Sequence, residues 1–134
     1  MVAPGSVFWD KLPGEPVRHL RIVLTHPDTD GCVIVVNVTD LDNRPSFGQL
    51  LVPGQHAEIT KKSTVMIHLA TKWTVAEVRE KIDAQLALPL LHMGHLKRVI
   101  DAVKNSREAP HSIRLALGWV PGSDSASRRF PKRP

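Results

Sequence analysis

The chain has 134 residues, of which 42% are hydrophobic, and a formal net charge of +5. This length suits one compact domain with a single core. The only cysteine, Cys32, excludes an internal disulfide and favours a reducing, cytoplasmic compartment. No apolar run reaches the length of a signal peptide or a membrane span, so we expect a soluble protein with no membrane partner.

The positive charge is concentrated at the carboxy terminus. Residues 123–134 hold four basic side chains and one acidic one, a net +3, which leaves only +2 for residues 1–122. The segment is rich in Ser, Pro and basic residues and has no apolar periodicity. We therefore predict a single domain over residues 1–122, followed by a flexible basic tail. The charge alone does not decide whether that tail contacts nucleic acid or only increases solubility.

Strands dominate the first half of the chain. The expected strands cover residues 5–12, 19–25, 32–39, 49–52 and 64–70. The third is rich in β-branched residues, and "HPDTDG" before it has the composition of a tight turn. About five strands joined by short turns predict a small antiparallel barrel or a highly curved sheet.

Helices are expected later in the chain. Thr74 and Glu77 have the spacing of a capping box, and Trp73 before them can pack on the first helical turn. Apolar residues then recur at helical spacing over 93–103. Residues 112–120 fit either a last helical turn or an edge strand. The expected class is mainly β with a carboxy-terminal helix, an α+β fold.

Alternation along the strands separates an aliphatic face from a polar one. His19 and Arg21 share one face of the second strand, and Asn37 and Thr39 share one face of the third. A hairpin turning at residues 28 and 29 would place His19 opposite residue 38, next to Thr39. These polar faces either converge on a site or form a half-solvated sheet face, and the pattern alone favours the second reading.

The order of these segments resembles the MazF/PemK family of toxin endoribonucleases. The stretches that carry the resemblance are "GSVFW", "HLRIVLT", "CVIVVNVT", "STVMIHLA" and the closing helix, within residues 5 to about 105. The resemblance implies a small SH3-like barrel that pairs as a homodimer. It also implies metal-independent cleavage of single-stranded RNA, with no cofactor, and neutralisation by a cognate antitoxin.

Two positions carry the family's catalytic pattern. Thr39 matches the Thr that ends the Val-rich strand, and His19 stands where the family has a catalytic Arg before its apolar strand. The chain departs from the pattern at this Arg and at Ser6, which replaces an Asp. Divergent PemK-like sequences share the His-Leu pair and a "PG-x-H" turn, which here contains His56. The resemblance therefore implies that His19 and Thr39 are the catalytic pair.

Histidine is chemically suited to this reaction. Cleavage of RNA without a metal needs a base, an acid and a donor or cation that stabilises the charged phosphorane, and histidine transfers protons near neutral pH. The sequence does not assign the acid and the base separately. The side chains predicted to contact RNA are Arg18, Arg21, His56, Lys61, Lys62 and His68.

Other chemistry has weaker support. His92 and His95 lie three residues apart and could share a metal, but two ligands without a third do not make a zinc signature. Cys32 is expected in the core. The alternative function is a non-catalytic binding protein on the same barrel, either a degenerate toxin or a poison that resembles gyrase inhibitors.

Overall fold

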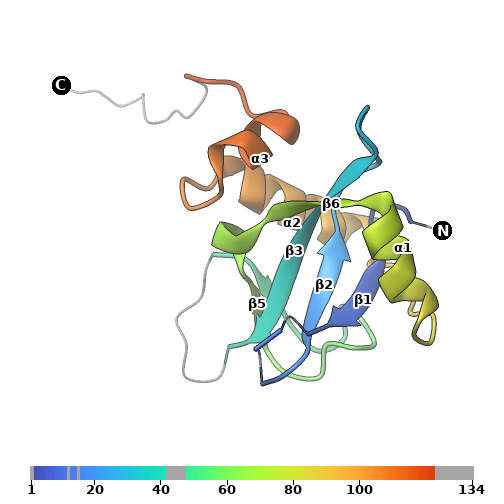
Figure 1. Ribbon diagram of the computed structural model, residues 1–134. Helices are drawn as coiled ribbons and strands as arrows, with labels where there is room; N and C mark the ends of the chain where they lie inside the picture. The colour runs from blue at the N-terminus through green and yellow to red at the C-terminus, as the bar shows by residue number, and fades with distance from the viewer. Residues whose placement is uncertain (1, 12, 15, 42–47, 123–134) are drawn as a thin grey trace.

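The computed structural model describes residues 2–11, 13–14, 16–41 and 48–122, so the predicted tail over 123–134 lies outside the described residues (Figure 1). The strands are β1 (Val7–Asp10), β2 (His19–Val23), β3 (Cys32–Asp40), β4 (Leu50–Leu51), β5 (Ser63–Val65) and β6 (Thr71–Thr74). The helices are α1 (Val75–Asp83), α2 (Met93–Asn105) and α3 (His111–Ala116), with a 3-10 turn η1 (Ile67–Leu69). The α+β class is confirmed, and the undecided stretch over residues 112–120 is helical as far as Ala116.

The sheet is antiparallel and open. Its strands follow the order β1-β2-β3-β5-β4, and β6 pairs separately with β3. β3 has two partners on one edge because its first half pairs with β6 and its last three residues pair with β5. Among the described residues no pairing joins β4 to β1. The sheet is therefore not closed into the predicted barrel.

The predicted strand over residues 64–70 is wrong in its second half. The ladder ends at Val65, and Met66 then donates its backbone N–H to the carbonyl of Asn37 at 2.8 Å. The next residues form η1, with the N–H of Leu69 on the carbonyl of Met66 at 3.0 Å. This turn lets the chain leave β5 and return as β6 beside the other half of β3.

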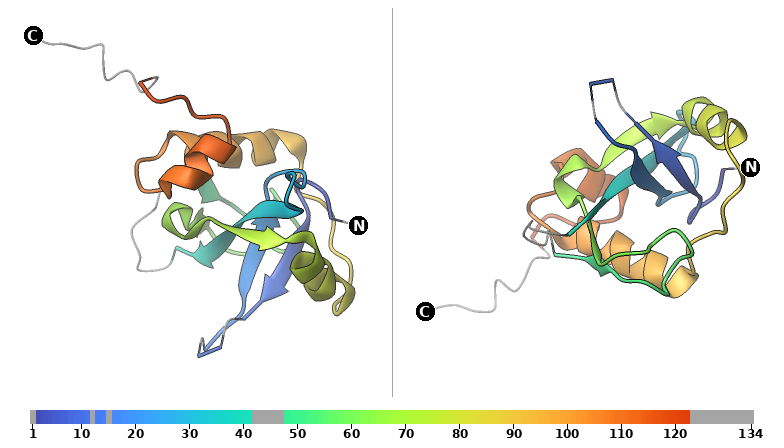
Figure 2. Two further views of the ribbon diagram at one scale, coloured as in Figure 1. Left: turned by 45° about the horizontal axis from the view of Figure 1, so that its top comes forward. Right: turned by 90° about the horizontal axis from the view of Figure 1, so that it is seen from below.

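Apolar side chains form two clusters, one on each face of the sheet. The larger joins the aliphatic residues of β2 and β3, such as Ile22 and Val36, to Val99 and Val103 of α2. The smaller includes Val35 and other sheet residues beneath α1. Figure 2 shows α1 and α2 on opposite sides of the sheet. The predicted aliphatic face is thereby confirmed as the main core.

The start of α1 follows the predicted capping box. Thr74 accepts a hydrogen bond from the N–H of Glu77 at 3.1 Å, and its own N–H donates to the Glu77 carboxylate at 2.9 Å. Trp73 packs with Val78 in the smaller apolar cluster, as a hydrophobic staple requires.

The prediction for Cys32 is wrong, because this side chain at the start of β3 is only half-buried and belongs to neither core cluster.

Candidate functional site

A pocket of about 370 Å³ lies where β2 begins and β3 ends. Its lining includes Trp9, Arg18, His19, Thr39, Glu58 and Lys61. We call it the His19 pocket. Four of the residues that the sequence predicted for the site, two catalytic and two RNA-contacting, therefore border one cavity.

The pairing of β2 with β3 explains why His19 and Thr39 meet. Leu20 lies opposite Val38 in the ladder, so continuing the register by one residue places His19 opposite Thr39. The sequence predicted residue 38 and was one position off. Alternation places Arg18 on the other face of β2 from His19. The pocket thus gathers residues of both sheet faces at the end of a strand pair.

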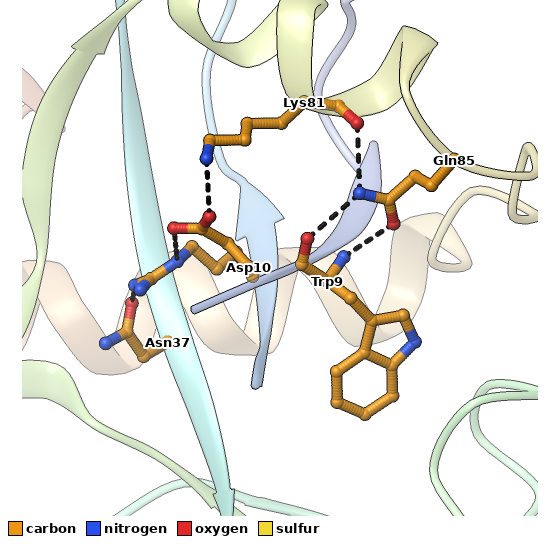
Figure 3. Close-up of polar contacts among 6 residues, drawn as sticks. Trp9, Asp10, Asn37, Lys81 and Gln85 are labelled. Atoms are coloured by element: carbon orange, nitrogen blue, oxygen red, sulfur yellow. Dashed lines mark hydrogen bonds and ion pairs between the residues drawn. The ribbon is translucent and has the colours of Figure 1, made fainter. Parts of the chain in front are cut away.

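Trp9 forms a fixed wall of the His19 pocket. Its indole Nε1 donates to a carboxylate oxygen of Glu58 at 2.8 Å, and the guanidinium carbon of Arg18 lies 5.1 Å from its ring centroid. Its backbone is held by the Gln85 amide, which accepts from the Trp9 N–H at 2.8 Å and donates to its carbonyl at 2.9 Å (Figure 3). An aromatic surface, a cation and a carboxylate are therefore held together.

Lys61 adds a second cation at the mouth of the pocket. Its ammonium lies 3.9 Å from the Asp40 carboxylate, with both side chains more than half exposed. Such an exposed pair is weak because water screens it. Lys61 can therefore exchange Asp40 for a phosphate at little cost.

The other predicted RNA contacts do not line this pocket. His56 is buried, with Nε2 at 2.7 Å from the carbonyl of Pro89 and Nδ1 accepting from the N–H of Glu58 at 3.0 Å. It therefore ties the loop that carries Glu58 to the segment before α2. Lys62 and His68 are exposed elsewhere on the surface.

Arg21 belongs to a buried polar network that lies between the sheet and α1. Its Nε donates to Asp10 at 3.1 Å, its Nη1 donates to the Asn37 side-chain oxygen, and Lys81 of α1 reaches the other Asp10 oxygen at 2.9 Å (Figure 3). Arg21 is only 2% exposed. The expectation of a half-solvated sheet face is therefore wrong here, because this network covers the polar side chains.

The network borders a second cavity of about 500 Å³. Its lining includes Asp10, Arg21, Asn37, Leu69, Trp73 and Lys81. We call it the Trp73 groove. Arg21 also contributes to it through its guanidinium, whose carbon lies 5.4 Å from the Trp73 ring centroid.

The histidines of α2 have local roles. His92 caps the helix by accepting the N–H of Gly94 on Nδ1 at 3.0 Å, and His95 Nδ1 lies 2.5 Å from an Arg98 nitrogen. Desolvation, followed by the charges of Arg98 and His92, lowers the pKa of His95 from its ordinary value. In the described part of the chain no three His, Cys, Asp or Glu side chains are grouped to hold a metal ion.

Sequence reasoning missed Trp9, Glu58, Asp10 and Lys81. Trp9 and Asp10 were assigned only to a first strand, and Glu58 and Lys81 belong to no motif. The pairing of β1 with β2 and the packing of α1 on β1 bring Trp9, Asp10 and Lys81 to the two cavities, and the hydrogen bond from Trp9 brings in Glu58.

No known family model matches the sequence, and no curated protein matches it either. Among the described helices, none is long and apolar enough to cross a membrane.

Proposed function

We propose that the protein is a toxin of the MazF/PemK kind, a metal-independent endoribonuclease that cleaves single-stranded RNA. In this proposal the open sheet is a variant of the family's SH3-like fold, and the protein acts as a homodimer and is neutralised by an antitoxin. The observation that carries the proposal is the joint presence of His19, Thr39, Arg18 and Lys61 around one pocket. These are a proton-transfer group, a hydroxyl donor and two cations.

The pocket supplies each group that the chemistry needs. The 2′-oxygen attacks the adjacent phosphorus after a base takes its proton, and the bond from phosphorus to the 5′-oxygen breaks as an acid protonates that oxygen. The products are a 2′,3′-cyclic phosphate and a 5′-hydroxyl. Arg18 and Lys61 stabilise the phosphorane charge, and Thr39 donates one hydrogen bond to it.

Glu58 is the base in this proposal, and His19 is the acid. Trp9 fixes one carboxylate oxygen of Glu58, which leaves the other to accept a proton. Asp40, the other carboxylate of the pocket, is exposed and paired with Lys61. A carboxylate base and a histidine acid avoid the need for a metal-bound hydroxide.

The first test is incubation of a long RNA with the protein in EDTA. His19→Ala should abolish cleavage, and Thr39→Val should slow it by a smaller factor because it removes one donor and no proton-transfer group. His26→Ala is the control, since His26 is exposed in the β2–β3 turn. Wild-type rates in both pocket variants would show that the site lies elsewhere. No cleavage by the wild-type protein would favour the binding-only alternative.

A second test separates the base from the acid. Glu58→Gln keeps an oxygen that can accept from Trp9, so the fold should persist while cleavage falls. A nucleoside 3′-(p-nitrophenyl phosphate) has a leaving group that needs no proton. His19→Ala should therefore recover activity on this substrate, whereas Glu58→Gln should not. The reverse pattern would exchange the two roles.

Light scattering at micromolar concentration tests the homodimer, which should have about twice the chain mass.

A further inference from the structure

The Trp73 groove has one apolar wall and a polar floor. Its lining includes Thr71 and Trp73, which share one face of β6, and Leu69 at the end of η1, which is 43% exposed. The floor is made by Arg21 and Asn37, which are 2% and 6% exposed. An exposed aliphatic side chain beside an indole ring is a surface suited to a flat apolar ring.

The floor of the groove offers mainly hydrogen-bond donors. Both oxygens of Asp10 already accept, one from Arg21 and one from Lys81. The Asn37 oxygen accepts from Arg21, so the Asn37 amide chiefly has N–H groups to give to a ligand. A ligand for this floor must therefore carry hydrogen-bond acceptors, such as carbonyl or phosphate oxygens.

The charges of the groove favour an anion by a small margin. Its cations are Lys11, Arg21, Lys72 and Lys81, and its carboxylates are Asp10, Glu77 and Glu80, a net +1. Glu77 is committed to the capping box of α1. Lys81 is 42% exposed, so its ammonium stands at the opening, where a negative ligand group can reach it.

The contribution of this ion pair to stability does not by itself explain why the fold keeps a buried polar network. The side chains of Arg21 and Asp10 are each 3% exposed. Burial of two charges costs desolvation energy, and well-packed apolar residues of similar volume often serve the fold equally well. A charged floor inside a cavity of about 500 Å³ is also suited to orient a polar ligand.

We propose that the Trp73 groove binds one nucleotide, with its base against Trp73 and its phosphate at Lys81. A nucleotide combines the flat ring, the oxygen acceptors and the negative charge that the groove selects, and base stacking on aromatic side chains is a common mode of binding. The inference concerns a second site, and nucleotide binding there does not require cleavage in the His19 pocket.

The position of the groove suggests how the two cavities are related. Arg21 and Asn37 lie opposite each other in the ladder, two residues from His19 and Thr39 on the same strands. Two residues along a strand span about 6.6 Å. The bound nucleotide is therefore either a free mononucleotide or one unit of an RNA strand that also enters the His19 pocket.

Calorimetric titration with nucleoside monophosphates and with a short single-stranded RNA tests the proposal. Trp73→Leu removes the ring and Lys81→Met removes the charge but keeps most of the stem, and each should weaken binding roughly tenfold. Lys97→Met is the matched control, because Lys97 is also a helical lysine paired with an aspartate, Asp101, and does not line the groove. A thermal melt of each variant shows whether it is folded. If Trp73→Leu does not fold, the binding affinity of Lys81→Met alone tests the proposal.

The outcomes are distinct. Weaker binding of monophosphates identifies a free nucleotide as a ligand, whereas weaker binding of RNA alone identifies a unit of a strand. The proposal is wrong if the wild-type protein binds neither, or if both variants bind like the Lys97→Met control. Nucleotide binding that depends on Lys81, without RNA cleavage by the wild-type protein, would sustain this inference and refute the proposed function.

Discussion

Removal of Asp10 should destabilise the fold far more than removal of an exposed aspartate with similar partners. Asp10 lies between Arg21 and Lys81, and its side chain is 3% exposed. Asp10→Ala leaves the buried guanidinium without its carboxylate, and the loss of one partner of a buried pair costs about 3–5 kcal/mol. That is a large fraction of the roughly 5–15 kcal/mol by which single domains are stable.

Asp101 is the matched control for this perturbation. It also lies between two cations, Lys97 at 3.4 Å and Lys104 at 3.8 Å, but its side chain is 43% exposed. Because water screens these contacts, Asp101→Ala should cost less than about 1 kcal/mol.

Urea denaturation of the two single variants and of Asp10→Ala/Arg21→Met measures these differences. The double variant removes both buried charges and should recover most of the loss. It still leaves Asn37 without its Arg21 donor, at a cost of about 1 kcal/mol. The reasoning is refuted if Asp10→Ala costs no more than Asp101→Ala, or if the double variant is less stable than Asp10→Ala alone.

Three further predictions concern local structure. Thr74→Ala removes the capping box and should lower the free energy of unfolding by about 1 kcal/mol in urea denaturation; an unchanged midpoint would contradict this. Gly5 and Gly14 both have positive φ, but a Cβ at Gly5 would lie 3.1 Å from a backbone oxygen and one at Gly14 meets nothing within 4 Å. Both alanine variants should lose roughly 1–2 kcal/mol to backbone strain, and Gly5→Ala should lose more; equal thermal shifts would refute the contact argument. The backbone N–H of Cys32 is the main cause that lowers the pKa of Asp28 below 3.8. The stability from this carboxylate is therefore present above pH 3.8 and lost as pH falls through the folded pKa, so Asp28→Asn should flatten the acid limb of a stability-pH curve.

Local patterns in the sequence predicted the elements that depend on near neighbours. The β1 to β3 strands follow from apolar runs bounded by turn residues, and the start of α1 follows from the side chains of Thr74 and Glu77. The meeting of His19 with Thr39 was predicted to within one residue, because a short turn fixes the register of a hairpin. The predicted barrel is wrong, because closure depends on whether distant strand edges pair, and among the described strands β4 and β1 do not pair.

The missed features all depend on long-range packing. β6 was not predicted because "TKWT" is short, and its strand conformation comes from pairing with Val33 and Val35. Glu58 and Trp9 are 49 residues apart, and nothing in either local sequence indicates that they meet. Such contacts complete the lining of the His19 pocket, which explains why the residues predicted there were incomplete.

The length of α1 explains the change from apolar to polar along one face of the sheet. Val78 covers the part of the face that carries Val23 and Val35, and all three side chains are fully buried. Lys81 follows one turn later and meets Asp10 in place of an apolar residue. Near Arg21, α1 contributes only the polar side chains of Glu77, Glu80 and Lys81, and these line the Trp73 groove. The alternation of Arg21 with Val23 in β2 therefore marks where the apolar cover by α1 gives way to polar cover.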